Sequence, residues 1–281
     1  MTVTTLQTAQ RSRAYVVVSG PDAAGYLDRM VSNEVETLEV GESCEALLLT
    51  PKARVIAPLT VWRRAGDDFL LLTEPAAGAR VARELMRARF AAKCRIDPEE
   101  HRSLLVVGAD SALVLNEHKR LWVANRDYGV PTVELIDADP SDLVDSSVVL
   151  ERISHDELER LRILARTPRL GHELDDRVLP AEAGLEERAI SFTKGCYPGQ
   201  EPVARLHYRG HPNRGLRVLA LEGPTPPEYD AELILEEKVV GRVTSAVPDP
   251  DHGVVALAYV RREVPADAIL RCEGRTVRHV A

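Results

Sequence analysis

The pattern of apolar and polar positions predicts alternating strands and helices over the first third of the chain. Residues 13–19 are apolar and rich in valine, which predicts a strand. The Gly-Pro-Asp sequence that follows breaks this strand, and the amphipathic stretch of residues 22–30 predicts a helix. Further strands are predicted over residues 43–50, 54–63 and 69–73, with turns at residues 51–53 and 66–68.

Two more helices have recognisable starting points. The first is predicted over residues 75–90, because proline is favoured in a first helical turn and Val81, Leu85 and Met86 fall on one face. The second begins at residues 154–157, where Ser-His-Asp-Glu has the form of a capping box. In such a box the serine and the glutamate each satisfy a free backbone amide. We expect this helix to end near residue 166.

The rest of the chain predicts a second, different structural unit. Residues 103–108 predict one more strand, and residues 125–145 are rich in turn-forming residues. After residue 216, short apolar segments alternate with Pro, Gly and Asp turns, at residues 217–221, 233–236, 239–245 and 254–260. Strands at this spacing without helices indicate a small antiparallel barrel or sandwich. A domain boundary is therefore expected near residue 215.

Composition and charge narrow the class of protein. The chain has 281 residues, of which 44% are hydrophobic, and a net charge of −8, as expected of a globular protein. The acidic total argues against direct binding to nucleic acid or to an anionic membrane, although a local basic pocket for an acidic small molecule remains open. No apolar run approaches the ~20 residues of a membrane span, and residues 1–13 lack the apolar core of an export signal. We therefore expect a cytoplasmic location.

Most common chemical motifs are missing from the sequence. The four cysteines are far apart and form no C-x-x-C pair, so neither a zinc knuckle nor a disulfide framework is expected: Cys44, Cys94, Cys196 and Cys272. His207 and His211 have the spacing of two metal ligands on a helix, but Gly210 and Pro212 would break that helix. No metal site is therefore predicted.

The segment that carries candidate chemistry is K-G-C-Y-P-G-Q-E, over residues 194–201. Its two glycines allow a tight bend and a close approach to a ligand or partner. The proline that follows favours the start of a helix, whose free amides and positive end favour a nearby anion. Lys194 adds a positive charge, so Cys196 is the cysteine with a case for reactivity as a thiolate.

The same string resembles the signature of the YgfZ-type proteins, folate-binding relatives of the glycine cleavage aminomethyltransferase (T-protein). Other segments are similar to this family as well: residues 20–23 and 32–35, the Pro-Lys-Ala-Arg-Val turn at 51–55, the Pro-Ala-Glu-Ala-Gly-Leu block at 180–185, and Asn-Arg at 213–214. The resemblance extends over residues 13–281.

The resemblance implies an α+β fold in which a ring of sub-domains surrounds a tetrahydrofolate pocket. Two interleaved sub-domains would form residues 1–215, and an antiparallel β-barrel would form residues 216–281. Glu182 is the candidate to bind the pterin, because a carboxylate accepts two N–H bonds from an amino-pyrimidine edge. The other candidate contacts to tetrahydrofolate or a derivative are Arg214, Lys52, Arg54, Tyr197 and Gln200.

The chain departs from the aminomethyltransferases where their catalytic carboxylate stands. Aligning the family turn on Ala53-Arg54 places Ala57 and Pro58 at the Asp-Asp pair of those enzymes, and neither side chain can accept a proton. The Glu-Ala-Gly that ends a helix in those enzymes is replaced by Leu-Ala-Arg at residues 164–166. The T-protein reaction is therefore expected to be lost.

The function implied is that of an accessory protein for the assembly or repair of iron–sulfur clusters in client enzymes, tRNA-modifying ones among them. Cys196 and Lys194 would be its working residues, with folate as the bound cofactor and without direct contact to nucleic acid or membrane. Two alternatives stay open. One is a folate-dependent aminomethyltransferase that uses another acid, such as Asp67, Asp68 or Glu34, and the other is a docking module that has lost folate.

Overall fold

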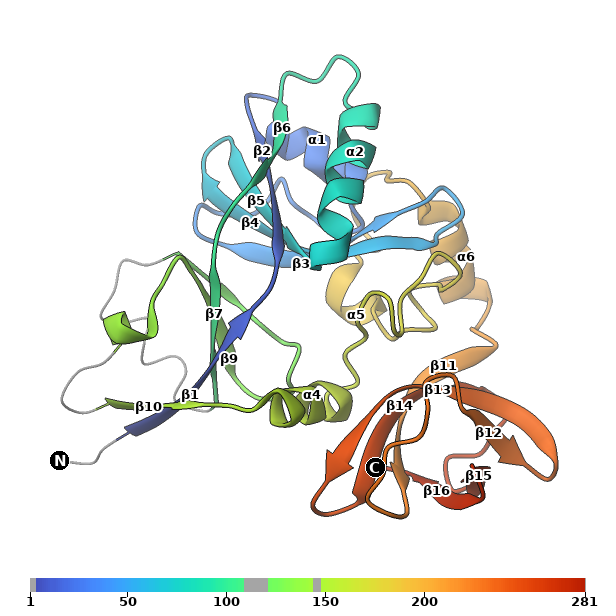
Figure 1. Cartoon of the computed structure of the whole chain (residues 1–281). Helices are drawn as coiled ribbons and strands as arrows, with labels where there is room; N and C mark the ends of the chain where they lie inside the picture. Colours follow the sequence, from blue (N-terminus) through green and yellow to red (C-terminus); the bar gives the residue numbers. More distant parts are fainter. Residues whose placement is uncertain (1–3, 109–120, 144–147, 281) are drawn as a thin grey trace.

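The computed structural model describes residues 4–108, 121–143 and 148–280, and it consists of two five-stranded sheets and a C-terminal barrel, connected by short helices (Figure 1). The first sheet has the strand order β10-β1-β7-β9-β8. Its strands are β10 (Val148–Arg152), β1 (Thr4–Arg11), β7 (Ser103–Val107), β9 (Thr132–Ile136) and β8 (Trp122–Ala124). All neighbours in it are antiparallel except β1 and β10, which are parallel.

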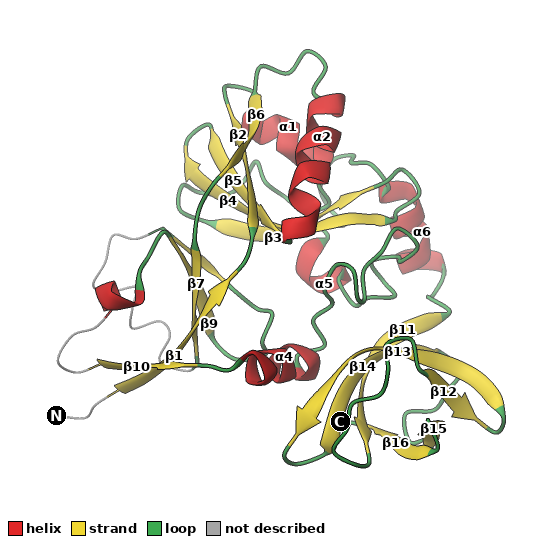
Figure 2. Cartoon of the chain, in the orientation of Figure 1, coloured by secondary structure: helices red, strands yellow, loops and turns green. Residues whose placement is uncertain are grey.

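The second sheet is fully antiparallel and is covered by helices. Its order is β3-β4-β5-β2-β6, with β3 (Ser43–Leu49), β4 (Val55–Ala65), β5 (Asp68–Thr73), β2 (Ala14–Ser19) and β6 (Arg95–Glu99). Helix α1 (Ala23–Met30) and helix α2 (Gly78–Ala88), which follows a short 3-10 turn η1 (Pro75–Ala77), pack on one face (Figure 2). Leu27, Val81 and Leu85 from these helices are buried against Phe69 and Leu71 of the sheet.

Within the described residues the chain crosses between the two sheets twice, through residues 12–13 and through residues 100–102. His101 lies at the second crossing and joins the sheets through both ring nitrogens. Nδ1 is 2.7 Å from Oδ2 of Asp137, just after β9, and Nε2 is 2.9 Å from Oε2 of Glu99 in β6. This histidine therefore braces the junction between the sheets.

Short helices complete the ring. They are η3 (Pro140–Leu143), α4 (His155–Leu164), α5 (Glu186–Ala189) and α6 (Gln200–Arg209). The predicted cap of α4 is present, since the Ser154 side chain accepts a hydrogen bond from the amide of Glu157 at 3.1 Å. The Glu157 carboxylate, however, pairs with Arg160 on the next turn. The deeply buried residues of this helix are Arg162 and Ile163, whereas its leucines are half-buried.

The C-terminal strands close into an antiparallel barrel, as predicted, in the order β11-β14-β13-β12-β15-β16. The strands are β11 (Arg214–Leu221), β12 (Glu232–Leu235), β13 (Lys238–Asp249), β14 (Gly253–Arg261), β15 (Leu270–Cys272) and β16 (Arg275–His279). A separate core of small and branched side chains, such as Leu219, Val260 and Val277, fills the barrel. Among the described residues, no helix is long and apolar enough to span a membrane.

Three local expectations were wrong or incomplete. The region predicted as turn-rich contains strand β9, and residues 144–145 of it lie outside the described residues. Met86 is 49% exposed, because Val81, Ala82 and Leu85 already fill the face of α2 that meets the sheet. Strands β1, β6, β8, β10, β15 and β16 were not predicted. β1, β6 and β16 contain many polar residues, and β8 and β15 are only three residues long.

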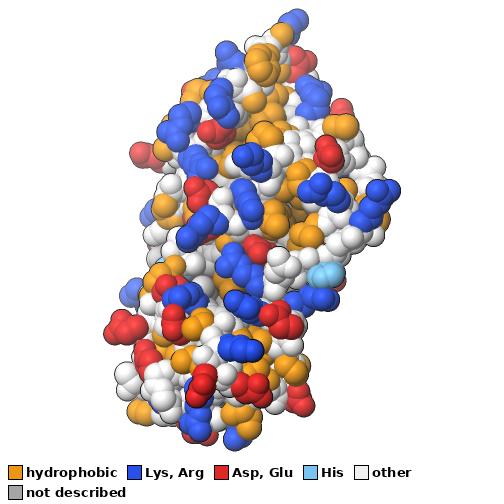
Figure 3. Space-filling model, turned by 90° about the vertical axis from the view of Figure 1, so that its right-hand side faces the viewer, with side chains coloured by type: hydrophobic (Ala, Val, Ile, Leu, Met, Phe, Trp, Pro, Cys, Tyr) orange, Lys and Arg blue, Asp and Glu red, His pale blue; other side chains and the backbone are white. Residues whose placement is uncertain are grey.

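The net negative charge is unevenly distributed over the surface. On the side of the molecule that carries α6, Lys and Arg side chains gather over the upper two thirds of the face (Figure 3). An acidic protein can therefore present cationic surface locally, and the total charge does not exclude an anionic partner.

Candidate functional site: a polar cavity at the centre of the ring

A cavity of about 790 Å³ lies where the two sheets, α4 and the segment of residues 167–169 meet. Part of its wall is apolar and is formed by Leu47, Leu59, Leu158 and Leu185, together with Pro58. The remainder is densely charged. A volume of this size, with an apolar wall and a few fixed polar groups, is typical of a pocket for a small molecule.

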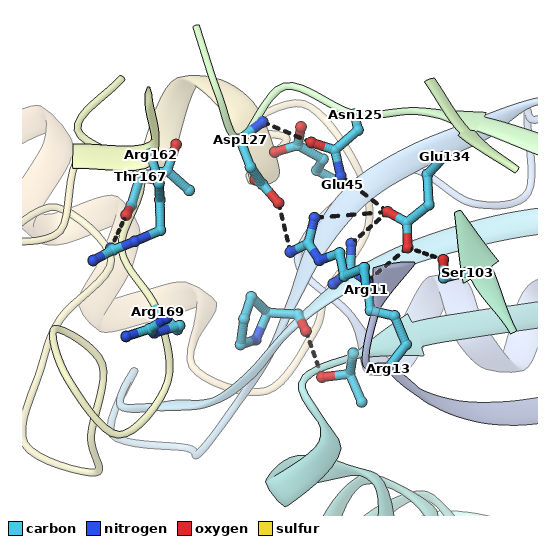
Figure 4. Close-up of polar contacts among 12 residues, drawn as sticks. Arg11, Arg13, Glu45, Ser103, Asn125, Asp127, Glu134, Arg162, Thr167 and Arg169 are labelled. Atoms are coloured by element: carbon cyan, nitrogen blue, oxygen red, sulfur yellow. Dashed lines mark hydrogen bonds and ion pairs between the residues drawn. The ribbon is translucent and has the colours of Figure 1, made fainter. Parts of the chain in front are cut away.

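The charged wall is organised around Glu134, a carboxylate with no exposed surface in the middle of β9. Arg13 forms a two-pronged ion pair with it, with both N–O distances at 2.9 Å. Ser103 donates a third hydrogen bond and Asn125 a fourth, the latter at 2.9 Å (Figure 4). Burial alone would raise the pKa of Glu134, but Arg13 and Arg11 outweigh it and lower the pKa to about 2.

Arg11 lies between this buried carboxylate and the cavity. Its Nη2 is 2.8 Å from Oδ2 of Asp127, whereas its Nη1 is 3.7 Å from Oε2 of Glu134 and has no hydrogen-bond partner. Burial alone would lower the pKa of Arg11, but Asp127 and Glu134 raise it, so the guanidinium stays charged. One buried donor next to the cavity is thus left without an acceptor among the described residues.

A third arginine balances the remaining negative charge of this cluster. Arg188 of α5 contacts both oxygens of Glu45 at 2.7 and 3.0 Å and Oδ1 of Asp127 at 2.9 Å. Counting Arg13 and Glu134, three guanidinium groups face three carboxylates. The cluster is therefore close to neutral as a whole.

The opposite wall is formed by Arg162 and Arg169, which Figure 4 shows across the open space from Arg11. Arg162 binds Glu159 at 2.7 and 2.9 Å and Glu173 at 3.0 Å, and Arg169 reaches Glu159 at 3.4 Å. Glu173 is itself buried and accepts a 2.6 Å hydrogen bond from Ser245 of the barrel. These pairs fix the wall and connect it to the C-terminal barrel.

Three charged residues at the cavity have no ion pair within the described part of the chain. Of the four carboxylate side chains that line it, Glu45, Asp127 and Glu159 are paired, and Glu74 is not. The exposed guanidinium groups of Arg126 and Arg152 also lack partners among the described residues. A ligand would therefore meet one free anion and two free cations.

The position of the aminomethyltransferase carboxylate carries no acid in this structure. Ala57 is fully buried, and Pro58 lines the cavity and accepts a 2.8 Å hydrogen bond at its carbonyl oxygen from Thr73. Of the other acids considered from the sequence, Asp68 pairs with Arg64 at 3.0 Å. Neither Asp68 nor Asp67 lines the cavity, and Glu34, bound by Ser191 and Thr193, does not line it either.

The signature loop lies outside the cavity, at the start of α6. The Lys194 ammonium donates to the carbonyl oxygens of Asp28, Val31 and Asn33 at 2.5–3.1 Å, and its side chain is 1% exposed. Burial lowers its pKa, partly offset by Asp28. Lys194 therefore anchors the loop to the end of α1, while Cys196 is exposed.

The rest of the loop packs against the β3–β4 turn, and this packing requires one of its glycines. Gly199 has φ +85°, and a Cβ there would lie 2.6 Å from the carbonyl oxygen of Thr50, so this glycine is required by the close approach of the β3–β4 turn. Tyr197 is buried beside this turn, its hydroxyl has no partner among the described residues, and burial raises its pKa to about 12. Gln200 is the first residue of α6.

The predicted folate contacts of the later blocks bind one another. Arg214 forms an ion pair with Glu182 at 3.1 Å and lies 4.6 Å from the centre of the Tyr259 ring. Arg54 donates to the carbonyl oxygen of Arg177, and Lys52 is exposed in the β3–β4 turn. None of the residues predicted from the sequence as working or folate-contacting residues lines the central cavity. Their roles stay predictions.

The residues of the cavity wall were missed by the sequence analysis, although some left a signal. Glu134 is the one charged residue in the apolar strand Thr-Val-Glu-Leu-Ile, and Arg162 interrupts the apolar side of α4. A charge in such a position needs a buried partner. The sequence does not identify that partner, because Arg13 is 121 positions from Glu134.

Comparisons with known proteins agree with this architecture. The model of the GCVT N-terminal domain family matches residues 10–155. The tRNA-modifying protein YgfZ of Edwardsiella ictaluri is 29% identical over 90% of this chain and 84% of its own length. An aminomethyltransferase of Streptomyces avermitilis is 26% identical over 87% of this chain and 75% of its own length.

The fold is also that of a solved enzyme. The glycine cleavage system aminomethyltransferase T from Bartonella henselae superimposes with a TM-score of 0.82, covering 98% of this chain and 85% of that one at 22% identity. The expected α+β ring with a C-terminal barrel is thereby confirmed. Because the family model spans more than half of the chain, and YgfZ proteins align over most of it, this chain belongs to the GCVT N-terminal domain family as a YgfZ-type member.

Proposed function

We propose that this chain binds tetrahydrofolate or a derivative in the central cavity and acts as an accessory protein for iron–sulfur clusters in client enzymes. The observation that supports folate binding best is the cavity itself, about 790 Å³ at the centre of an aminomethyltransferase-like ring. Its wall fits the ligand, since Leu59 and Pro58 offer apolar surface to a ring, while Glu74 offers a free anion and Arg126 and Arg152 offer free cations. The bound folate would supply one-carbon carrier chemistry.

A thermal-shift titration tests the folate part. A ligand that binds the folded chain raises its melting temperature with concentration. We expect tetrahydrofolate to raise the melting temperature of the wild type and of Glu182→Ala alike, because Glu182 lies outside the cavity. If tetrahydrofolate raises the melting temperature of the wild type but not of Glu182→Ala, the pterin site lies at Glu182, as the sequence motif implies.

We assign the contact with client enzymes to Cys196. This cysteine is exposed at the start of α6, whereas Cys44 is half-buried and burial raises the pKa of its thiol to about 12. Clusters take about four ligands, and the described residues hold no group of three or more His, Cys, Asp or Glu side chains placed for a metal ion. A cluster contact through Cys196 would therefore be shared with the client.

Complementation tests this role. In a host lacking the corresponding gene, we expect Cys196→Ala to fail to restore the activity of an iron–sulfur client such as a tRNA-modifying enzyme, and Cys44→Ala to restore it. Full restoration of client activity by Cys196→Ala would show that the Cys196 thiol is not needed for this function.

The lining of the cavity also agrees with the expected loss of the T-protein reaction. Pro58 at the position of the catalytic carboxylate offers no group that accepts a proton, and three of the four lining carboxylates are held in ion pairs. We expect the purified chain to form no methylene-tetrahydrofolate from an aminomethyl-lipoyl carrier. Formation of that product would instead establish a transferase.

A further inference from the structure

Residues 80–97, the α2–β6 segment, run from the first turn of α2 into β6 and expose two large apolar side chains to water. Phe90, two residues after the end of α2, is 90% exposed, and Met86, one turn before it, is 49% exposed. Val81 and Leu85 of the same helix are buried against the sheet. The core is therefore already filled, and Phe90 and Met86 contribute nothing to it.

Phe90 also has an unfavourable backbone conformation. It directly follows the C-cap residue of α2, and its φ of +45° lies in the left-handed region. Glycine is usual at this position of a helix end, because a Cβ makes the left-handed conformation less stable. Neither the exposed ring nor this conformation stabilises the folded chain. The combination therefore points to a binding role for the Phe90 side chain.

The α2–β6 segment is cationic, although the whole chain is acidic. It contains six Lys or Arg residues and two acids, which gives a net charge of +4, against −8 for the chain. The two acids, Glu84 and Asp97, pair with Arg87 and Arg95 at 2.6 and 3.2 Å. The other four cations have no ion pair within the described part of the chain: Arg80, Arg83, Arg89 and Lys93.

This segment forms one extremity of the molecule. The loop between α2 and β6 is the uppermost part of the view in Figure 1, and the same end in Figure 3 shows hydrophobic side chains among Lys and Arg. Asp22, just before α1, accepts a 2.7 Å hydrogen bond from the backbone amide of Lys93, so it leaves the ammonium group free. A convex, cationic end with an exposed aromatic ring suits a flat anionic partner.

We propose that the α2–β6 segment binds reversibly to the surface of an anionic lipid bilayer. Its unpaired cations attract acidic headgroups, and Phe90, with Met86 behind it, inserts at the boundary between headgroups and acyl chains. The negative total charge of the chain does not prevent this contact, because charges more than about 10 Å away are largely screened by salt. The inference does not rest on the proposed folate function.

Co-sedimentation of the full chain with lipid vesicles tests this proposal. We expect the wild type to sediment with phosphatidylglycerol vesicles at low ionic strength and not with phosphatidylcholine vesicles, and we expect added salt to weaken the binding. A wild type that stays in the supernatant with phosphatidylglycerol vesicles at low ionic strength would overturn the proposal.

Two variants test the assignment to this segment. Phe90→Gly suits the positive φ, so it should fold at least as stably as the wild type while binding phosphatidylglycerol vesicles about fivefold more weakly. The double variant Arg83→Gln/Lys93→Gln should bind them about tenfold or more weakly, because two cations are lost. Ile269→Ala removes an apolar side chain of the C-terminal barrel that is 56% exposed, and this matched control should bind like the wild type.

Phe90→Trp reports insertion of the side chain directly. The wild type contains two tryptophans, Trp62 in β4 and Trp122 in β8, and its emission should not shift when phosphatidylglycerol vesicles are added. The emission of Phe90→Trp should shift to shorter wavelength, because the added indole enters a less polar environment.

Three further results would contradict the proposal. If Phe90→Gly and the double variant keep wild-type affinity for the vesicles, the bilayer contact lies elsewhere on the molecule. An unchanged emission of Phe90→Trp in the presence of bound vesicles would show that the side chain does not insert. Binding of the wild type to polyglutamate but not to phosphatidylglycerol vesicles would assign the segment to an acidic protein partner instead.

Discussion

At the scale of single residues, the wall of the cavity is stabilised by a buried charged residue. Glu134 has no exposed surface, and taking a carboxylate out of water is expensive unless it is paired and hydrogen-bonded. Arg13, Ser103 and Asn125 occupy its oxygens, and Arg11 lies 3.7 Å from it on the side of the cavity. The wall of the cavity therefore depends on one carboxylate that the ligand itself would not touch.

Removing this carboxylate should destabilise the protein strongly. We expect Glu134→Gln to lower the free energy of unfolding by about 3–5 kcal/mol, because Arg13 is left buried without a counter-charge. The double variant Arg13→Met/Glu134→Leu should recover much of the loss. Urea denaturation measures both, and a loss below about 1 kcal/mol for Glu134→Gln would contradict the pairing.

Glu134 should also make the stability of the protein depend on pH in the acidic range. The pKa of Glu134 is lowered from 4.5 to about 2 in the folded chain, so its stabilising contribution is complete above its unfolded value and disappears as the pH falls toward 2. The difference in unfolding free energy between wild type and Glu134→Gln should therefore shrink between pH 5 and about pH 3. A difference that stays constant over this interval would argue that Glu134 is not charged in the folded protein.

At the scale of elements, the signature loop and the β3–β4 turn fix one another. Gly199 approaches the turn so closely that a Cβ would collide with backbone atoms of Thr50 and Ala53, whereas Gly195 faces open space. Lys194 binds the carbonyl groups at the end of α1. The motif thus has an architectural reason for several of its residues, and it leaves Cys196 exposed.

The two glycines of the motif should respond differently to substitution. We expect Gly199→Ala to cost at least about 2 kcal/mol of stability, from its positive φ and the backbone collision, and Gly195→Ala to change stability by less than about 0.5 kcal/mol. Thermal unfolding compares the two variants. Equal melting temperatures would show that the loop does not pack on the turn as described.

The contribution of His101, at the crossing between the sheets, to stability should also depend on pH. Burial acts to lower the pKa of His101, but Asp137 and Glu99 raise it above its ordinary value of 6.5. Its stabilising contribution is therefore complete below about pH 6.5 and is lost as the pH rises through the raised value. We expect the stability difference between wild type and His101→Ala to fall between pH 6.5 and 9, as measured by urea denaturation. A difference that grows with pH would have the wrong sign.

At the scale of the whole molecule, the sequence was most informative where local pattern decides the structure. The strand at residues 14–19, the cap at Ser154 and the barrel strands β11 to β14 follow from periodicity and turn residues. Strand β9 was missed because its central glutamate breaks the apolar pattern, and β1 because it is largely polar. Both strands are stabilised by pairing with distant segments, which a local pattern does not contain.

The cavity could not be predicted for the same reason. Its wall combines Arg11, Glu74, Asp127, Arg162 and Arg188, which come from five separate segments of the chain. The family motif led instead to Glu182 and Arg214, which the structure pairs with each other. A motif identifies the family, whereas the residues that line the cavity come together only in the folded chain. The folate role of Glu182 and Arg214 stays a prediction.

The most direct test of the account is a calorimetric titration of tetrahydrofolate into the wild type, Ser12→Trp and Glu182→Ala. Ser12 is exposed and lines the cavity, so a tryptophan there would fill the space without disturbing a core. The account predicts saturable binding by the wild type and by Glu182→Ala, and loss of binding by Ser12→Trp. Undiminished binding by Ser12→Trp, or no binding by the wild type, would contradict a folate site in the central cavity.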